Sequence, residues 1–277
     1  MVEGSRSELR RLDQAQTTHY KRSLTFIIFT IITLTFSLFT FMNPGFMKNQ
    51  IAKESNSVVA ERFVNQRFDN FAETIGAERQ GNVSNLLTVT QTQPIADAMI
   101  DYTLGIHWFR AENASLAKQI RKVILTKIDD NSSTEAKSVQ NKLKKYNQSG
   151  IYSVITGFEL AQTTLAANVE TLFLVINIVV IVMCLLAGYS ILREMHDLLP
   201  TKRLIHLVTS AGMWTGGLLI VIFALFALVP LIFNVEGLIL NIGYFLEIAS
   251  GIFLELVIIG AGVFIISTIV WQLTSNE

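Results

Sequence analysis

Four long apolar stretches, separated by segments of more polar composition, set the pattern of this chain. They cover residues 23–42, 171–192, 207–233 and 248–273. A helix needs about 20 mostly apolar residues to cross a bilayer, because in hydrocarbon every backbone polar group must be paired within the segment. The first three stretches carry no formal charge and the fourth carries one, Glu255. The pattern predicts four transmembrane helices.

The polar segment 43–170 shows helical rather than alternating periodicity. Apolar residues recur at steps of three and four, as on one face of an amphipathic helix. Examples are Val64, Phe68, Phe71 and Ile75, and later Ile151, Val154, Phe158, Ala161 and Leu165. The last stripe is expected to continue into the second transmembrane helix without interruption.

Turn-forming residues divide this segment. The main breaks are predicted at Gly81-Asn82, around residues 110–113 and at Ser149-Gly150, with a weaker one at residues 129–133. Four helices return the chain to the side where it started, so we predict an up-down-up-down helical bundle between the first and second transmembrane helices. The expected fold class is therefore an all-α integral membrane protein with an extracytoplasmic bundle.

The distribution of Lys and Arg in short segments predicts the orientation. Residues 1–22 and 193–206 are basic, whereas 234–247 and 274–277 contain neither Lys nor Arg. The N-terminal segment, the loop 193–206 and the tail 274–277 are therefore expected in the cytoplasm, and segment 43–170 outside. Residues 234–247 are too few for a normal span and are expected to form an outer interfacial connection, or alternatively part of a broken helix.

Composition supports a membrane location and narrows the function classes. Charged residues make up 16% of the chain, against about 25% in an average soluble domain. The 22 basic and 22 acidic side chains cancel, so no bulk charge attracts nucleic acid. The single cysteine, Cys184, excludes an intramolecular disulfide and a Cys-rich metal site.

The first apolar stretch is expected to be an uncleaved signal anchor, because no A-x-A-like cleavage site follows it. The outer segment contains no Cys, which favours the plasma membrane of a bacterium, specifically a Gram-positive one. Four Asn-x-Ser sequons in the same segment leave glycosylation open; they begin at Asn82, Asn113, Asn131 and Asn147.

Several polar residues interrupt the predicted transmembrane helices. Glu255, Asn177 and Ser37 are expected at comparable depth, and Ser37 shares one face of the first helix with Thr33 and Thr30. A carboxylate in hydrocarbon is costly unless it is neutral, paired or in a polar cavity. These residues are candidates for an intramembrane polar cluster that binds a proton, an ion or a headgroup. The alternative is interhelical hydrogen bonding.

Two further features concern packing and partners. Gly212 and Gly216 form a GxxxG pattern that permits close helix approach, so a homo-oligomer stays open. Trp214 and Trp271 are placed as interfacial anchors near the cytoplasmic side.

The loop 193–206 mixes charges of both signs with apolar residues, either as a helix that docks a protein partner or as a solvated turn. Its candidate contact residues are Arg193, His196, Asp197, Lys202 and Arg203. No spacing of a metal site and no catalytic motif occurs. We expect no enzyme activity, no cofactor and no metal.

These observations favour a non-enzymatic regulatory or accessory subunit whose outer domain binds a ligand or a protein. Its expected partners are membrane lipid and a protein in the membrane or cytoplasm, not nucleic acid. The topology also resembles that of ABC permeases of the cell-division and macrolide-exporter type, in which residues 193–207 would meet the ATPase, although an all-helical outer domain departs from that family. A small proton- or ion-coupled protein using Glu255 is a third hypothesis.

Overall fold

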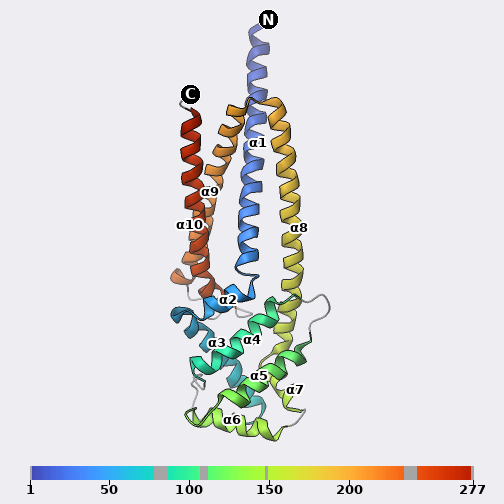
Figure 1. The fold of residues 1–277 in the computed structure, drawn as a ribbon, viewed down its shortest axis with the longest axis vertical. Coiled ribbons are helices and arrows are strands. Elements are labelled where there is room, and N and C mark those ends of the chain that lie inside the picture. The colour runs from blue at the N-terminus through green and yellow to red at the C-terminus, as the bar shows by residue number, and fades with distance from the viewer. Residues whose placement is uncertain (1, 78–86, 107–111, 147–148, 234–241, 276–277) are drawn as a thin grey trace. The chain divides into compact units, whose positions relative to one another are not determined.

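The structure, a computed structural model, describes residues 2–77, 87–106, 112–146, 149–233 and 242–275. Within these ranges every regular element is an α-helix, which confirms the predicted all-α class there (Figure 1). The helices are α1 (Val2–Phe39), α2 (Pro44–Ile51), α3 (Glu54–Thr74), α4 (Val89–Leu104), α5 (Asn113–Lys127), α6 (Thr134–Lys145), α7 (Ser149–Gly157), α8 (Leu160–Leu198), α9 (Thr201–Ile232) and α10 (Ile242–Ser275).

Four of these helices are long and apolar enough to cross a membrane: α1 from Gln16, α8, α9, and α10 from Tyr244. Large apolar side chains on them are exposed, among them Leu186, Val221 and Ile258. Exposed apolar surface on this scale is unfavourable in water and is satisfied by lipid. The four helices therefore support a multi-pass membrane protein.

The helix ends differ in places from the segments expected from hydropathy. The segment 193–206 is mostly helical, because α8 continues to Leu198 and α9 begins at Thr201. Pro200 precedes α9 as its N-cap residue, where the missing N–H costs no helical hydrogen bond. Of the connection 234–247, residues 242–247 form the start of α10, and residues 234–241 lie outside the described ranges.

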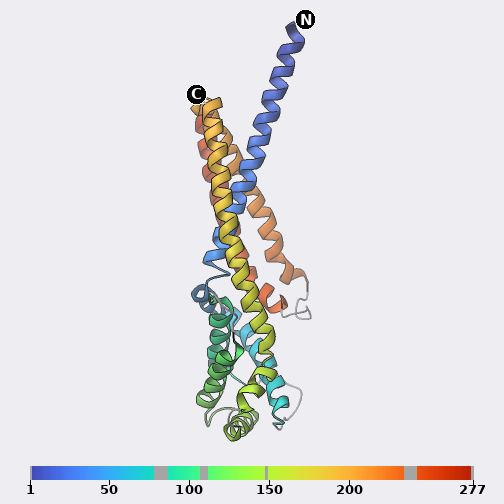
Figure 2. The same ribbon diagram turned by 90° about the vertical axis from the view of Figure 1, so that its right-hand side faces the viewer.

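The chain divides into two compact units. Unit 1 comprises Met1–Ser37, Ile176–Asn234 and Ala249–Glu277, and unit 2 comprises Leu38–Val175 and Val235–Ile248. Helix α8 is a single helix of 39 residues that contributes to both units (Figure 2).

In unit 1, hydroxyl groups join α1 to α9. Thr215, which is fully buried, donates through Oγ1 to the backbone oxygen of Thr25 at 3.1 Å. Thr25 in turn lies 3.4 Å from the backbone oxygen of Ala211. In hydrocarbon such bonds replace the hydrophobic attraction that joins helices in water.

Helices α9 and α10 approach each other closely where both have glycine. A Cβ atom on Gly216 would lie 2.7 Å from the backbone oxygen of Gly260 and 2.7 Å from the backbone nitrogen of Phe264. A Cβ on Gly212 would meet the hydroxyl of Ser267, the end of a small side chain. The predicted packing glycines therefore both face α10, and Gly216 lies against its backbone.

Unit 2 is built around buried aromatic and aliphatic side chains from α3 to α7. Phe68, Phe71 and Phe158 are completely buried, and Phe71 lies 5.6 Å from Phe158 between ring centroids. A Cβ on Gly157 would overlap the Cα of Phe71, so α7 reaches α3 only because this residue is glycine.

Polar side chains satisfy backbone groups at the ends of these helices. The buried Asn65 on α3 accepts from the backbone N–H of Leu87 at 2.8 Å and donates to its oxygen at 2.9 Å. Gln140 on α6 donates to the backbone oxygen of Ile128 at 2.8 Å, just after α5 ends. Unpaired backbone groups at these ends would otherwise destabilise the unit.

Two expectations about segment 43–170 need correction. Among the residues described between α1 and α8, six helices, α2 to α7, are found where four were expected, since the weak break at residues 129–133 separates α5 from α6 and the short α2 is additional. The last amphipathic stripe is also interrupted, because α7 ends at Gly157 and Glu159 adopts a φ of 50°. A left-handed backbone conformation cannot continue an α-helix.

The glycine contact in unit 1 predicts a difference between two neighbouring substitutions. Gly216→Ala should lower the free energy of unfolding by about 1–3 kcal/mol, because the new methyl group meets the backbone of α10. Gly217→Ala is the matched control, since a Cβ there meets nothing within 4 Å. Thermal unfolding of the purified protein in detergent measures both. Equal losses for the two variants would contradict the close approach at Gly216.

Candidate functional site

Unit 2 contains a largely apolar cavity of about 510 Å³. This volume falls within the range of small-molecule sites, about 300–1,000 Å³. Its polar lining residues are Arg67, Thr103, Gln162 and Thr163. Its other lining residues are Phe41, Met47, Ile51, Val59, Ala60, Phe63, Ala96, Met99, Ile100, Leu104, Leu165, Ala166, Val169, Tyr244, Phe245 and Ile248.

Arg67 is the charged residue of this lining and is itself only 6% exposed. Its guanidinium forms an ion pair with Glu159 and lies 5.5 Å from the ring centroid of Phe63. A buried guanidinium needs such a partner, because removing its positive charge from water costs several kcal/mol of free energy. The pair keeps Arg67 at the cavity wall.

Glu159 reaches Arg67 from the break between α7 and α8. Its φ of 50° is uncommon for a residue with a side chain. Asn70 on α3 also donates to the Glu159 carboxylate, at 3.5 Å. Glu159, the residue at which the chain turns from α7 into α8, is thus held to α3 by Arg67 and Asn70.

The first turns of α10 are attached to α3. Arg62 donates through one nitrogen, Nη2, to both carboxylate oxygens of Glu247 at 2.9 Å. Tyr244 donates to Gln66 at 3.3 Å, and its ring lies 5.5 Å from that of Phe63. This end of α10 thus forms one wall of the cavity, and its contacts with α3 include an ion pair and a tyrosine.

Helix α2 forms another wall and is joined to α4 by an ion pair of 2.7 Å between Lys48 and Asp101. The hydrogen bond to Asp101 raises the pKa of the Lys48 ammonium. Burial raises the pKa of the nearby Asp97 carboxyl, although a hydrogen bond from Gln93 partly opposes the shift. The charges on this face therefore lie outside the cavity, whose interior stays apolar.

The cavity favours a ligand that is mostly apolar and carries few polar groups. Leu165, Val169 and Phe245 line it and are 64%, 40% and 46% exposed. Covering such side chains removes apolar surface from water, which stabilises a complex by roughly 25 cal/mol per Å². Polar groups at the wall can then orient one end of the ligand.

The residues predicted as an intramembrane cluster lie on three helices of unit 1. Asn177 on α8 is 5% exposed, whereas Glu255 on α10 is half-buried. Thr30, Thr33 and Ser37 are half-buried on α1. Within the described ranges, Glu255 forms no hydrogen bond or ion pair, and the buried hydroxyl oxygen of Thr33 accepts or donates none. A common site for these residues stays a prediction.

The predicted cytoplasmic contact residues lie on either side of the turn between α8 and α9. Arg193, His196 and Asp197 are exposed in the last turns of α8, and Lys202 and Arg203 are exposed in the first turn of α9. His196 and Asp197 lie 3.8 Å apart. In the part of the chain described, no three His, Cys, Asp or Glu side chains form a metal-binding group.

Sequence reasoning missed the cavity and its charged residues. Arg67 follows Val64 by three positions and precedes Phe71 by four, so a basic residue occupies the apolar stripe of α3. That interruption was a usable signal for a buried ion pair. Glu159 and Glu247 carry no such signal, because their partners are far away in the sequence.

Comparisons with protein families, with curated proteins and with solved structures found no match for this chain.

Two carboxylates eight residues apart on α10 should respond differently to neutralisation. Glu247→Gln removes the partner of Arg62 and should lower the free energy of unfolding by about 0.5–1 kcal/mol. Glu255→Gln removes no hydrogen bond or ion pair within the described residues and should change it by less than about 0.5 kcal/mol. Thermal unfolding in detergent compares the two. A loss at Glu255 as large as that at Glu247 would show that Glu255 has a structural partner.

Proposed function

We propose that this protein is a non-enzymatic, multi-pass plasma-membrane protein whose unit 2 lies outside the cytoplasm and binds an amphiphilic ligand. The observation that carries the proposal is the 510 Å³ cavity, with its apolar lining and a few polar groups contributed by α3, α4 and α8. The protein would act as a regulatory or accessory subunit of a membrane complex.

The distribution of basic residues supports the proposed orientation. Basic residues cluster before the first apolar stretch and between the second and third, the two segments that the positive-inside rule assigns to the cytoplasm. Segment 43–170 is then external. The lack of Cys in it is consistent with a bacterial, Gram-positive surface.

The walls of the cavity suggest how a bound ligand would affect the candidate transmembrane helices. Leu165 and Val169 belong to α8, and Tyr244 and Phe245 belong to α10, and both helices continue as candidate transmembrane spans. A ligand that fits one arrangement of these walls better than another would shift the helices toward that arrangement. A protein partner that contacts the spans or the turn between α8 and α9 would bind the two arrangements with different affinity.

The cavity can be blocked from an exposed position to test the proposal. Ala166 lines it and is exposed on α8, so Ala166→Trp should fill the space without disturbing the core. Native mass spectrometry of the full chain in detergent, with oleic acid as the probe, measures the effect. The Ala166→Trp variant should bind oleic acid about tenfold more weakly than the unsubstituted protein, which corresponds to a loss of about 1.4 kcal/mol of binding free energy.

Ala161→Trp is the matched control, because Ala161 is exposed on the same helix but does not line the cavity. It should bind oleic acid as the unsubstituted protein does. If both Trp variants bind as the unsubstituted protein, or if none of the three proteins binds the probe, the cavity is not an amphiphile site.

A further inference from the structure

A second pocket, in unit 1, combines basic and hydroxyl side chains. It has a volume of about 460 Å³, and its lining includes Lys21 on α1 and Lys202, Arg203 and His206 on α9. Hydroxyl groups line it too, among them those of Ser210 and Thr274. None of the described residues that line it is acidic. Such a set of donors matches a phosphate group.

This pocket lies where helix ends meet. Its lining comes from α1, from the turn between α8 and α9, from the first turns of α9 and from the last turn of α10. Figure 1 shows that turn and the end of α10 on the same side as the N-terminus. The ring of His206 lies 5.0 Å from that of Trp271, an aromatic residue suited to the membrane interface.

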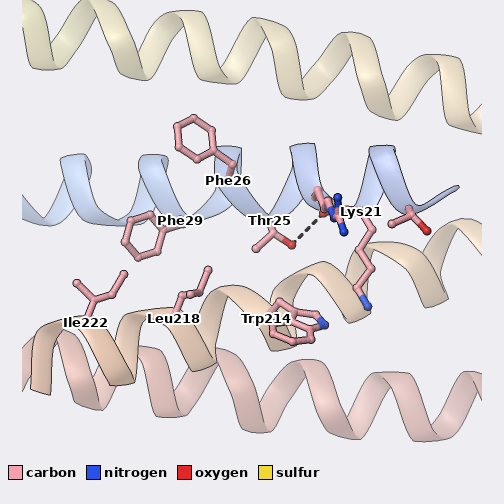
Figure 3. Close-up of a pocket in the computed structure, with 9 residues that line it drawn as sticks. Lys21, Thr25, Phe26, Phe29, Trp214, Leu218 and Ile222 are labelled. Carbon is pink, nitrogen blue, oxygen red and sulfur yellow. Dashed lines mark hydrogen bonds between the residues drawn. The ribbon is translucent and has the colours of Figure 1, made fainter. Parts of the chain in front are cut away.

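A neighbouring groove between α1 and α9 is apolar along most of its length. It has a volume of about 620 Å³, and Lys21 lines it as well as the basic pocket. Figure 3 shows Lys21 reaching from α1 toward Trp214 on α9, and its Nζ lies 5.6 Å from the Trp214 ring centroid. Lys21 therefore stands where the basic pocket and the groove adjoin.

From Lys21 toward the C-terminal ends of α1 and α9, the two helices present matching apolar stripes. Phe29 follows Lys21 by eight positions on α1, and Leu218 and Ile222 follow Trp214 by four and eight on α9 (Figure 3). Eight residues of helix extend about 12 Å. A long apolar groove with basic side chains at one end complements an anionic lipid. The basic end faces the negatively charged headgroup, and the apolar length accommodates an acyl chain.

We propose that this end of unit 1 binds an anionic phospholipid. Lys21, Lys202, Arg203 and His206 hold the headgroup phosphate, and one acyl chain lies in the groove between α1 and α9. Basic pockets between transmembrane helices are suited to such headgroups. The site is separate from the cavity of unit 2 and does not depend on the function proposed for it.

Native mass spectrometry of the full chain in detergent tests this site with phosphatidylglycerol and phosphatidylcholine as probes. Phosphatidylglycerol should bind more tightly. Arg203→Ala should lower the affinity for phosphatidylglycerol about fivefold, which is the contribution of one basic side chain near an anionic headgroup. Arg193→Ala is the matched control, because Arg193 is exposed at the end of α8 and lines neither pocket. Lys202→Gln provides a second variant should Arg203→Ala unfold.

The groove is tested separately from the charges. Leu218→Trp fills the groove and should weaken the binding of phosphatidylglycerol about as much as Arg203→Ala does. Val221 is exposed and lies outside the groove, so Val221→Trp should leave this binding unchanged. Equal binding of the two lipids, or equal losses for Arg203→Ala and Arg193→Ala, would overturn the proposal. Full competition by soluble glycerol phosphate, with no effect of Leu218→Trp, would identify a free-anion site instead of a lipid site.

Discussion

Backbone polar groups cannot remain unpaired in hydrocarbon, and the architecture follows from that constraint. Each unpaired N–H or C=O group costs several kcal/mol there, so the apolar stretches must be helical. The same medium gives helices no hydrophobic reason to associate. Unit 1 is accordingly joined by a hydroxyl bond from Thr215 to the backbone of Thr25 and by the close approach of Gly216 to Gly260. Both contacts require small side chains, which limits substitution more strictly than hydropathy alone.

Unit 2 is stabilised by a different balance of interactions. Its core of Phe68, Phe71 and Phe158 is fully buried, and side chains such as Asn65 satisfy backbone groups at helix ends. Burial of apolar area from water supplies the main favourable free energy in such a core. The cavity lies beside this core, and its walls are formed by α2, α3, α4, α8 and α10. An amphiphile in the cavity would complete the apolar contacts that the chain itself leaves unmade.

Hydropathy and helical periodicity predicted the four candidate spans and the all-helical class of the described residues, because both depend on local constraints. The break at Glu159 was missed because it depends on tertiary contacts: Gly157 fits against Phe71, and Glu159 pairs with Arg67. The residues lining the cavity were missed for the same reason. Spacing along a span gives a residue's depth but not the neighbour it faces, so Glu255 and Asn177 could be matched in depth without evidence of contact.

The attachment of α10 bears directly on the proposed regulation. A ligand changes a conformational equilibrium only by the difference between its affinities for the two states. The contact between Arg62 and Glu247 is partly exposed, and such ion pairs contribute about 0.2–1 kcal/mol. A ligand whose preference for one cavity shape exceeds that amount would offset the loss of this one ion pair, whereas the contacts of Tyr244 with Gln66 and Phe63 would remain. Breaking a fully buried pair at this position would cost several kcal/mol, whereas this partly exposed pair is a small part of what holds the start of α10 against α3.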